Sequence, residues 1–238
     1  MSLSAILQIV KIDASYGALP VLRDVSIEAQ SGQTVAILGP NGHGKTALMR
    51  AISGLLPLSS GAIIYKGKDI TVLPAHRRRT IGIGHVPQGD LLFPDMSVSE
   101  NLEVGAYEHG SWPQRAEKMK RNFLLFPELE RRQRSLAGTL SGGERRMLAI
   151  ARAIMAPSDF LLVDEPSIGL APSAIIRVYE TLHRLKAEGV TILLVEETLA
   201  RVEHIADNVY LMDHGRIVAE STPQDLAGSD RIRKTYLG

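Results

Sequence analysis

The chain has 238 residues, 45% of them apolar, and its 27 basic residues almost balance 26 acidic ones for a formal net charge of +1. This apolar content excludes an intrinsically disordered chain, and the near-neutral charge gives no reason to expect a nucleic-acid partner. Cysteine is absent, which excludes disulfides and thiolate metal sites.

The first part of the chain alternates short apolar runs with turn residues, a pattern typical of strands. A helix is predicted over residues 45–53, where Gly54 ends it. Ser59-Ser60-Gly61 is predicted to be a turn. Two predicted strands, at residues 7–12 and 21–29, form an antiparallel pair. A further strand pair is predicted over residues 62–68, and single strands at 34–38 and 81–86.

Helical patterns dominate residues 94–157, and strand and helix alternation then resumes. This order predicts a helical subdomain inserted into a mainly parallel α/β core with helices on both faces. We therefore expect one domain over residues 1–238, with its core at about 1–93 and 158–238. The later predicted elements are strands at 160–163, 190–195, 209–212 and 217–219, a helix over 174–188, and a last helix with Thr222 as its N-cap.

The sequence contains no segment suited to a membrane. Residues 1–11 lack a basic start and a small-residue cleavage site, so they predict a strand rather than a signal peptide. The longest apolar runs, such as residues 160–163, are far shorter than the roughly 20 residues of a spanning helix. Any membrane role is therefore expected to depend on a partner. Two basic runs, at residues 77–79 and 131–134, are predicted to be solvated polar faces.

The motif Gly39-Pro40-Asn41-Gly42-His43-Gly44-Lys45-Thr46 matches the phosphate-binding loop pattern in full. It follows an apolar strand and begins a helix, where backbone N–H groups and the helix terminus attract phosphate. Lys45 is expected to reach the β- and γ-phosphates of ATP, and the Thr46 hydroxyl to ligate Mg²⁺. His43 occupies a variable position without an evident second ligand, so we interpret it as a spacer.

A second motif is the apolar strand that ends in Asp164 and Glu165. Asp164 is expected to bind Mg²⁺, and Glu165 to orient or deprotonate the attacking water. An acidic pair after a strand is also common as a polar edge. Together with the phosphate loop, the pair predicts a P-loop ATPase.

The third motif, Leu140-Ser141-Gly142-Gly143-Glu144, precedes a stretch of helical period. Ser141 and Glu144 match a capping box, which is consistent with an ordinary helix start. The paired glycines also bare backbone N–H groups, which would make this a second phosphate-binding helix terminus in the same chain.

With these motifs the sequence resembles the ABC ATPase family over nearly its whole length. Residues 140–144 resemble the family signature, Tyr16 the aromatic residue that stacks on adenine, and Gln88 the loop glutamine that senses Mg²⁺ and the transmembrane partner. Residues 167–171 resemble the dimer-contact loop. The resemblance implies a P-loop NTPase core with an N-terminal antiparallel β subdomain. It also implies a head-to-tail dimer, in which each ATP lies between the phosphate loop of one chain and the signature of the other.

A narrower resemblance is to one of the two ATPases of branched-chain amino-acid importers, although importers of urea or other amides share much of the pattern. It implies transmembrane permease subunits, a second ATPase subunit of the same or a different chain, and an indirect link to a solute-binding protein. It also implies a peripheral position on the cytoplasmic face of the membrane. The segments that carry it are residues 93–101, 167–172, 195–197 and 236–238.

The sequence departs from the family pattern at three places. Glu197 aligns with the switch histidine, where the narrower group often has glutamine, and a carboxylate there should be repelled by a γ-phosphate unless it is turned away, protonated or paired. Ala47 and Arg145-Arg146 replace commoner polar residues. Slow hydrolysis, or a nucleotide-binding partner that relies on another subunit's active site, is therefore an alternative. A soluble ABC protein of DNA repair or translation is disfavoured, since the chain has neither a long coiled-coil insertion nor a second ATPase domain.

Overall fold

The computed structural model describes residues 5–107 and 112–228. Its centre is a six-stranded sheet in the order β10-β9-β3-β8-β7-β6. Neighbouring strands run parallel except for β9 and β10, which form an antiparallel hairpin. The strands are β3 (Thr34–Leu38), β6 (Ile83–Val86), β7 (Phe160–Asp164), β8 (Thr191–Glu196), β9 (Asn208–Asp213) and β10 (Arg216–Ser221).

Both faces of the central strands are buried, so their sequences read as continuous apolar runs rather than as alternating ones. In β3, Ala36 and Leu38 pack into one apolar cluster, and Val35 and Ile37 pack into another on the opposite face. β7 and β8 divide their side chains between the two clusters in the same way. The predicted α/β core with a mainly parallel sheet is confirmed.

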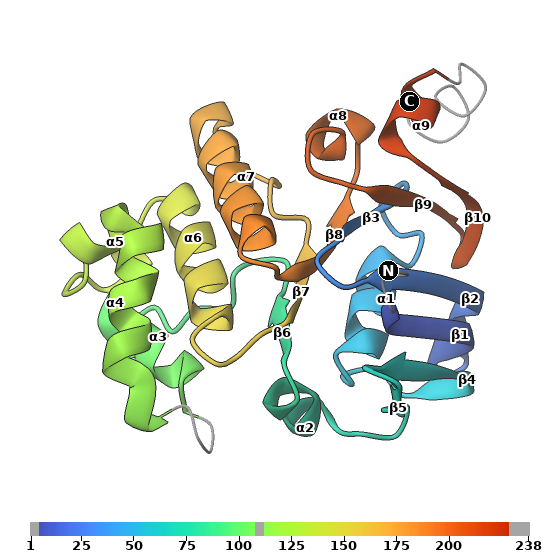
Figure 1. Ribbon diagram of the computed structural model, residues 1–238, viewed down its shortest axis with the longest axis horizontal. Helices are drawn as coiled ribbons and strands as arrows, with labels where there is room; N and C mark the ends of the chain where they lie inside the picture. The colour runs from blue at the N-terminus through green and yellow to red at the C-terminus, as the bar shows by residue number, and fades with distance from the viewer. Residues whose placement is uncertain (1–4, 108–111, 229–238) are drawn as a thin grey trace.

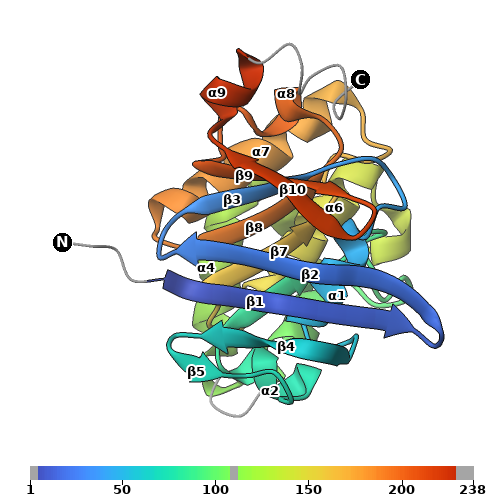
Figure 2. The ribbon, with the colours of Figure 1, turned by 90° about the vertical axis from the view of Figure 1, so that its right-hand side faces the viewer.

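A second, four-stranded antiparallel sheet has the order β2-β1-β4-β5. Helix α1 (Lys45–Ile52) lies between it and the central sheet, as the two views show (Figures 1 and 2). Leu48 and Met49 of α1 are fully buried in the cluster that joins the two sheets. The strands are β1 (Ala5–Tyr16), β2 (Leu19–Gln30), β4 (Leu58–Tyr65) and β5 (Lys68–Asp69).

The turn predicted at Ser59-Ser60-Gly61 is wrong, because these residues belong to β4. The register between β1 and β4 shifts at this point, which marks a bulge. Gly61 has φ of 81°, and an added Cβ would lie 2.3 Å from the Lys11 carbonyl oxygen. The glycine therefore serves a close approach of two strands and not a chain reversal.

The predicted helical region at residues 94–157 does carry helices, and they gather at one end of the molecule beside α7 (Figure 1). Helix α3 starts with a complete capping box formed by Ser97 and Glu100. The helices are α2 (Ala75–Thr80), α3 (Val98–Gly105), α4 (Arg115–Leu125), α5 (Pro127–Arg131), α6 (Gly142–Ala153), α7 (Pro172–Ala187), α8 (Leu199–Val202) and α9 (Pro223–Ala227), with 3₁₀ turns at Trp112–Gln114 and Ala137–Thr139.

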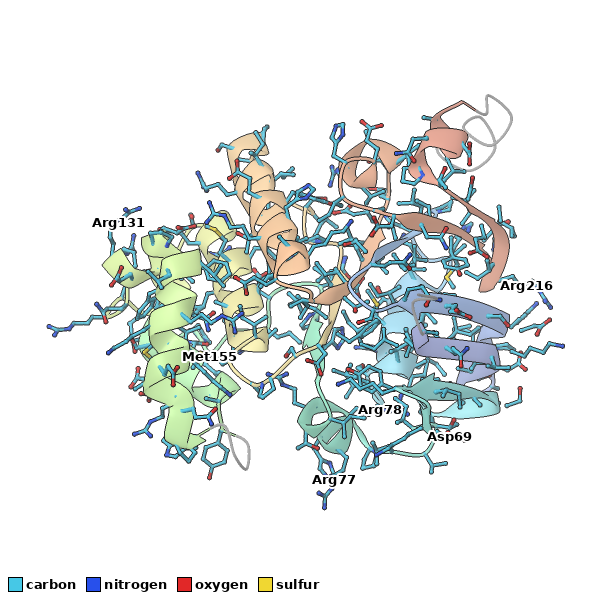
Figure 3. All side chains as sticks on the ribbon, viewed as in Figure 1. Asp69, Arg77, Arg78, Arg131, Met155 and Arg216 are labelled. Atoms are coloured by element: carbon cyan, nitrogen blue, oxygen red, sulfur yellow. The ribbon has the colours of Figure 1, made fainter. Side chains whose placement is uncertain are left out.

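One of the two basic runs is not the solvated face that its charge predicted. Arg78 is 3% exposed and donates hydrogen bonds of 2.8 Å to the carbonyl oxygens of Ala51 and Ile52. These carbonyls belong to the last turn of α1, where a cation is favoured by the helix dipole. The neighbouring Arg77 is exposed and points away from the molecule (Figure 3), whereas the half-buried Arg79 donates hydrogen bonds to Ser158 and to the Ala153 carbonyl.

Within residues 5–107 and 112–228, no helix is both long enough and apolar enough to cross a lipid bilayer.

Candidate functional site

The phosphate loop joins β3 to α1 and brings Lys45 into the interior. Lys45 is 3% exposed, and its Nζ donates hydrogen bonds to the carbonyl oxygens of Gly39 at 2.7 Å and Pro40 at 3.1 Å. Its Nζ also lies 3.4 Å from Oε1 of Glu165. A buried ammonium requires such partners, because an uncompensated charge in the interior is costly. Lys45 therefore links the loop to the acidic end of β7.

Asp164 and Thr46 approach one another from β7 and α1, with 3.4 Å between Oδ1 of Asp164 and the Thr46 hydroxyl. Asp164 is 1% exposed. Burial raises the pKa of Asp164 to about 6, and the neighbouring Glu165 carboxylate adds to the rise. The two oxygens form a pair of hard ligands, of the kind that suits a small dication such as Mg²⁺.

Glu165 is held by its backbone and by its side chain. Its φ is 45°, an uncommon value for a residue other than glycine, and its N–H donates to the Val195 carbonyl at 3.0 Å. Its Oε2 accepts a hydrogen bond of 2.8 Å from Nε2 of Gln88. The structure thus brings together Lys45, Thr46, Gln88, Asp164 and Glu165.

Of these residues, Lys45, Thr46 and Glu165 border a cavity of about 630 Å³, a volume suited to a ligand of moderate size. Tyr16 lines the same cavity, is 43% exposed, and accepts a hydrogen bond of 3.2 Å from Arg50. The aromatic face and the phosphate loop therefore share one cavity. Residues of the cavity wall that the sequence did not single out are Leu19, Pro20, Val21, Arg23, His214 and Gly215.

The signature lies elsewhere in the chain, at the start of α6. Ser141 and Glu144 form the predicted capping box, with the Glu144 N–H donating to the Ser141 hydroxyl at 3.3 Å. Ser141 borders a separate cavity of about 320 Å³ that includes Arg131 and Arg177. The paired glycines Gly142 and Gly143 begin α6, so the starts of α1 and α6 lie beside two different cavities.

The switch position carries an exposed carboxylate beside the phosphate loop. Oε1 of Glu197 accepts a hydrogen bond of 3.0 Å from Nδ2 of Asn41, while Oδ1 of Asn41 lies 3.4 Å from Nζ of Lys45. Glu197 is therefore joined to the phosphate loop by a hydrogen bond from a neutral amide.

The preceding residue, Glu196, is one that the sequence analysis missed. It is 1% exposed and accepts hydrogen bonds from the Tyr179 hydroxyl at 2.9 Å and the Ser167 N–H at 3.2 Å. Arg201 bonds to the Ser167 hydroxyl and lies 3.6 Å from Glu196. Glu196 therefore ties the segment after β7 to the end of β8. A pair of adjacent glutamates gives no sequence signal as to which one is buried.

The segment after Gln88 has an unusual backbone. Asp90 and Leu91 have φ of 63° and 45°. Arg146 from α6 lies 3.0 Å from Asp90, and Arg152 donates to the carbonyl oxygens of Asp90 and Leu91 at 3.2 and 2.8 Å. Two arginines of α6 thus hold this segment in place.

Leu91 and Phe93, which are 66% and 45% exposed, border a cavity of about 440 Å³. Leu92 instead packs against the core. The wall of this cavity also includes Arg79, His85 and Arg152.

His43, interpreted from the sequence as a spacer because no second ligand was evident, contacts Asp213 at the end of β9 and His214 in the turn that follows. Its Nδ1 lies 2.7 Å from Oδ1 of Asp213, and its ring stacks on that of His214 with centroids 4.2 Å apart. Asp213 and His214 are 170 residues away along the chain, so no local pattern could have paired them with His43. The segment at residues 236–238, which supported the narrower resemblance, lies outside the described residues.

The family model described as "ABC transporter" matches residues 22–168 of this chain. The branched-chain amino acid transport ATP-binding protein BraG of Pseudomonas aeruginosa is 38% identical, over 96% of this chain and 97% of its own length. The probable branched-chain amino acid transport ATP-binding protein LivF of Archaeoglobus fulgidus is 36% identical, over 98% of each chain.

The lipopolysaccharide export ATP-binding protein LptB of Escherichia coli is 32% identical, over 94% of this chain and 93% of its own. A crystal structure of a nucleotide-free ATP-binding cassette from an ABC transporter superposes with a TM-score of 0.89, at 28% identity, covering 99% of this chain and all of that one.

Proposed function

We propose that this chain, which belongs to the ABC transporter family and is an ATPase, powers the import of branched-chain or other hydrophobic amino acids. The observation that carries this proposal is the near-complete coverage of two relatives named for branched-chain amino acid transport. An exporter's ATPase is also related at lower identity. The direction of transport and its substrate are therefore the first points to test.

ATP is proposed to occupy the 630 Å³ cavity, with adenine against Tyr16 and the phosphates in the loop at residues 39–46. Lys45 then exchanges its hydrogen bonds to loop carbonyls for bonds to the β- and γ-phosphates. This exchange is favoured because a charge-assisted bond to phosphate is stronger than a bond to a neutral carbonyl.

Mg²⁺ is proposed to bind at Thr46 and Asp164. The 3.4 Å separation of their oxygens and the burial of Asp164 support this assignment, since a dication supplies the positive charge that a buried carboxylate lacks. Gln88, which donates a hydrogen bond to the adjacent Glu165, is proposed as a further ligand. The ion would neutralise charge on the phosphates.

Glu165 is proposed to orient the attacking water and accept its proton. Gln88 and Lys45 each hold one carboxylate oxygen, at 2.8 and 3.4 Å, which fixes the direction of the group. General bases of this kind contribute about 10²- to 10⁴-fold to a rate. Glu197, paired with Asn41, is proposed to lie near the γ-phosphate as the switch residue.

The working unit is proposed to be a head-to-tail dimer, in which the signature at residues 141–144 completes the site of a second chain. The two cavities share no lining residue, which supports this arrangement, because Ser141 does not border the cavity of its own chain's phosphate loop. We treat residues 1–93 and 158–238 as the core of one domain and residues 94–157 as its helical subdomain.

The groove lined by Leu91, Phe93 and Arg152 is proposed to receive a cytoplasmic segment of a transmembrane permease subunit. Exposed apolar side chains beside arginines suit an amphipathic segment that carries an acidic residue. Because Gln88 lies just before this surface, docking there could act on the bond between Gln88 and Glu165.

Deletion of the gene in its own host tests the transport proposal. Uptake of radiolabelled leucine should fall, and the wild-type gene should restore it while a Lys45→Ala variant should not. Unchanged leucine uptake would contradict amino-acid import. Loss of urea or amide uptake in the same strain would instead favour the alternative substrate class.

A further inference from the structure

We propose that His43, Asp213 and His214 form a binding site for a divalent transition-metal ion such as Zn²⁺, at the wall of the nucleotide cavity. The observation is the juxtaposition of two imidazoles and one carboxylate, whose potential ligand atoms all lie within 4.8 Å of one another. This site is separate from the oxygen pair proposed for Mg²⁺. Its test does not depend on ATP hydrolysis or on transport.

The backbone holds the three residues together. The turn between β9 and β10 places His214 and Gly215 at φ of 44° and 77°. The Gly215 N–H donates to the His43 carbonyl oxygen at 2.9 Å, and the Gly215 carbonyl accepts from the Arg23 N–H at 2.8 Å. The hairpin is therefore fastened by one main-chain bond to the phosphate loop and by another to β2, and the side chains meet without depending on a metal.

The side-chain geometry is close to what an ion requires. His43 Nδ1 lies 2.7 Å from Oδ1 of Asp213, and Nε2 of His214 lies 3.8 Å from the same oxygen. Zinc binds imidazole nitrogen and carboxylate oxygen at about 2.0–2.2 Å, so ligand atoms on one ion lie roughly 3–3.5 Å apart. His214 has an 80% exposed side chain and can adjust, whereas His43 and Asp213 are 21% and 29% exposed.

The ligand types select the class of ion. Imidazole suits Zn²⁺, Co²⁺, Ni²⁺ and Cu²⁺, whereas Mg²⁺ prefers oxygen ligands. Three protein ligands leave at least one coordination position open. His43 and His214 both line the nucleotide cavity, so a ligand in that cavity can occupy the open position.

A bland alternative is that Asp213 orients His43 by a hydrogen bond and that the two rings only stack. That arrangement needs no ion and would bind none with a defined stoichiometry. It also gives His214, with its strained backbone, no role beyond a ring contact. The two explanations therefore predict different results in a metal titration.

The test is titration of tag-free, nucleotide-free protein with Zn²⁺ in a calorimeter, with Co²⁺ absorption as a second probe of imidazole coordination. Nucleotide is left out because its phosphates chelate metal ions. We expect one Zn²⁺ per chain. A His214→Asn variant should bind at least about tenfold more weakly, because losing a ligand costs no less than losing an outer-shell partner. Asparagine is chosen since it tolerates the left-handed backbone of residue 214.

The matched control is His204→Ala, which removes a histidine of similar exposure, 84%, just after α8. It should bind Zn²⁺ as the wild type does. Thermal unfolding of each metal-free variant shows whether it is folded. Equal affinity in His214→Asn and wild type, or an equal loss in His204→Ala, would overturn the proposal, as would the absence of saturable binding.

Discussion

The start of α1 and the start of α6 both present backbone N–H groups, yet they differ in how much of a binding site the chain builds around them. At α1, Lys45 is 3% exposed and ion-paired with Glu165, and the cavity wall extends from Tyr16 to the β9–β10 turn. At α6, Ser141 is exposed, and the capping box satisfies only the N–H groups of Ser141 and Glu144.

The difference indicates that folding of a single chain assembles the site at the start of α1, whereas the start of α6 stays exposed. Buried charges around α1 require partners in the same chain, because desolvation penalises any that lack them. An exposed helix start has no such requirement, since water satisfies it. The signature can therefore be completed by a second chain without disturbing the core.

The largest effect is expected at Glu165. Glu165→Gln keeps the shape and the bond to Gln88 but cannot accept a proton, so turnover should fall about 10²- to 10⁴-fold while ATP binding persists. Phosphate release and nucleotide binding measure the two properties. Glu203→Gln, on the chain after α8, is the matched control. If Glu165→Gln kept more than a tenth of wild-type turnover, Glu165 would not be the general base.

Mixing two inactive variants tests whether the phosphate loop of one chain works with the signature of another. Lys45→Ala should abolish turnover through the loop, and Ser141→Arg should do so through the signature. A mixture should regain turnover if the chain pairs with itself, because each mixed dimer contains one site with an intact loop and an intact signature. Turnover by Ser141→Arg alone would contradict the role of the signature.

Stability should depend on Arg78 far more than on its neighbour. Arg78→Ala removes the guanidinium from the carbonyls of Ala51 and Ile52, of which Ala51 keeps a bond from the Gly54 N–H, and this should lower the free energy of unfolding by about 2–4 kcal/mol. Arg77→Ala, at an exposed position, should change it by less than about 0.5 kcal/mol. Denaturant unfolding measures both. Equal effects would mean that the buried hydrogen bonds do not stabilise the end of α1.

Asp164 should make stability depend on pH. Because burial raises its pKa from 3.8 to about 6, the folded state binds a proton more tightly than the unfolded state. The contribution of protonated Asp164 to the stability of the folded state is therefore complete below about pH 4 and is lost as pH rises through 6. Asp164→Asn should unfold at a higher temperature than the wild type at pH 7.5, by a few degrees, and this difference should shrink toward pH 4.

The exposed Asp95→Asn serves as the control for Asp164→Asn and should show no such trend. A constant difference in unfolding temperature between Asp164→Asn and wild type from pH 4 to 7.5 would mean that burial does not raise the pKa of Asp164. In the presence of Mg²⁺ and ATP the wild type should unfold at a higher temperature than Asp164→Asn, since asparagine is a poorer ligand for the ion.

The smallest effect is expected at Glu197. Glu197→Gln removes a negative charge near the proposed γ-phosphate while keeping an acceptor for Asn41. Because the side chain is exposed and screened by solvent, we expect turnover to rise only a few-fold. Measurement of kcat at low and high salt tests the electrostatic origin of the change. A fall in turnover would show that the carboxylate takes part in hydrolysis.

The sequence by itself determined the elements whose signals are local. The strand at Thr34–Leu38, the helix that begins at Lys45 and the capping box of Ser141 and Glu144 all follow from spacing, caps and apolar runs within a few residues. The proposed working residues of the site also lie together in the structure, because parallel strands and the loops after them meet at one edge of a sheet.

Tertiary structure decided what depends on distant contacts. The burial of Arg78 follows from carbonyls 26 and 27 residues away, and Gly61 lies in a bulge because β1 passes close to it. His43 acquires Asp213 and His214 only through the fastening of a hairpin to the phosphate loop. Charge, turn residues and lone histidines are ambiguous in sequence, because their roles are fixed by what packs against them, and that packing is a property of the whole fold.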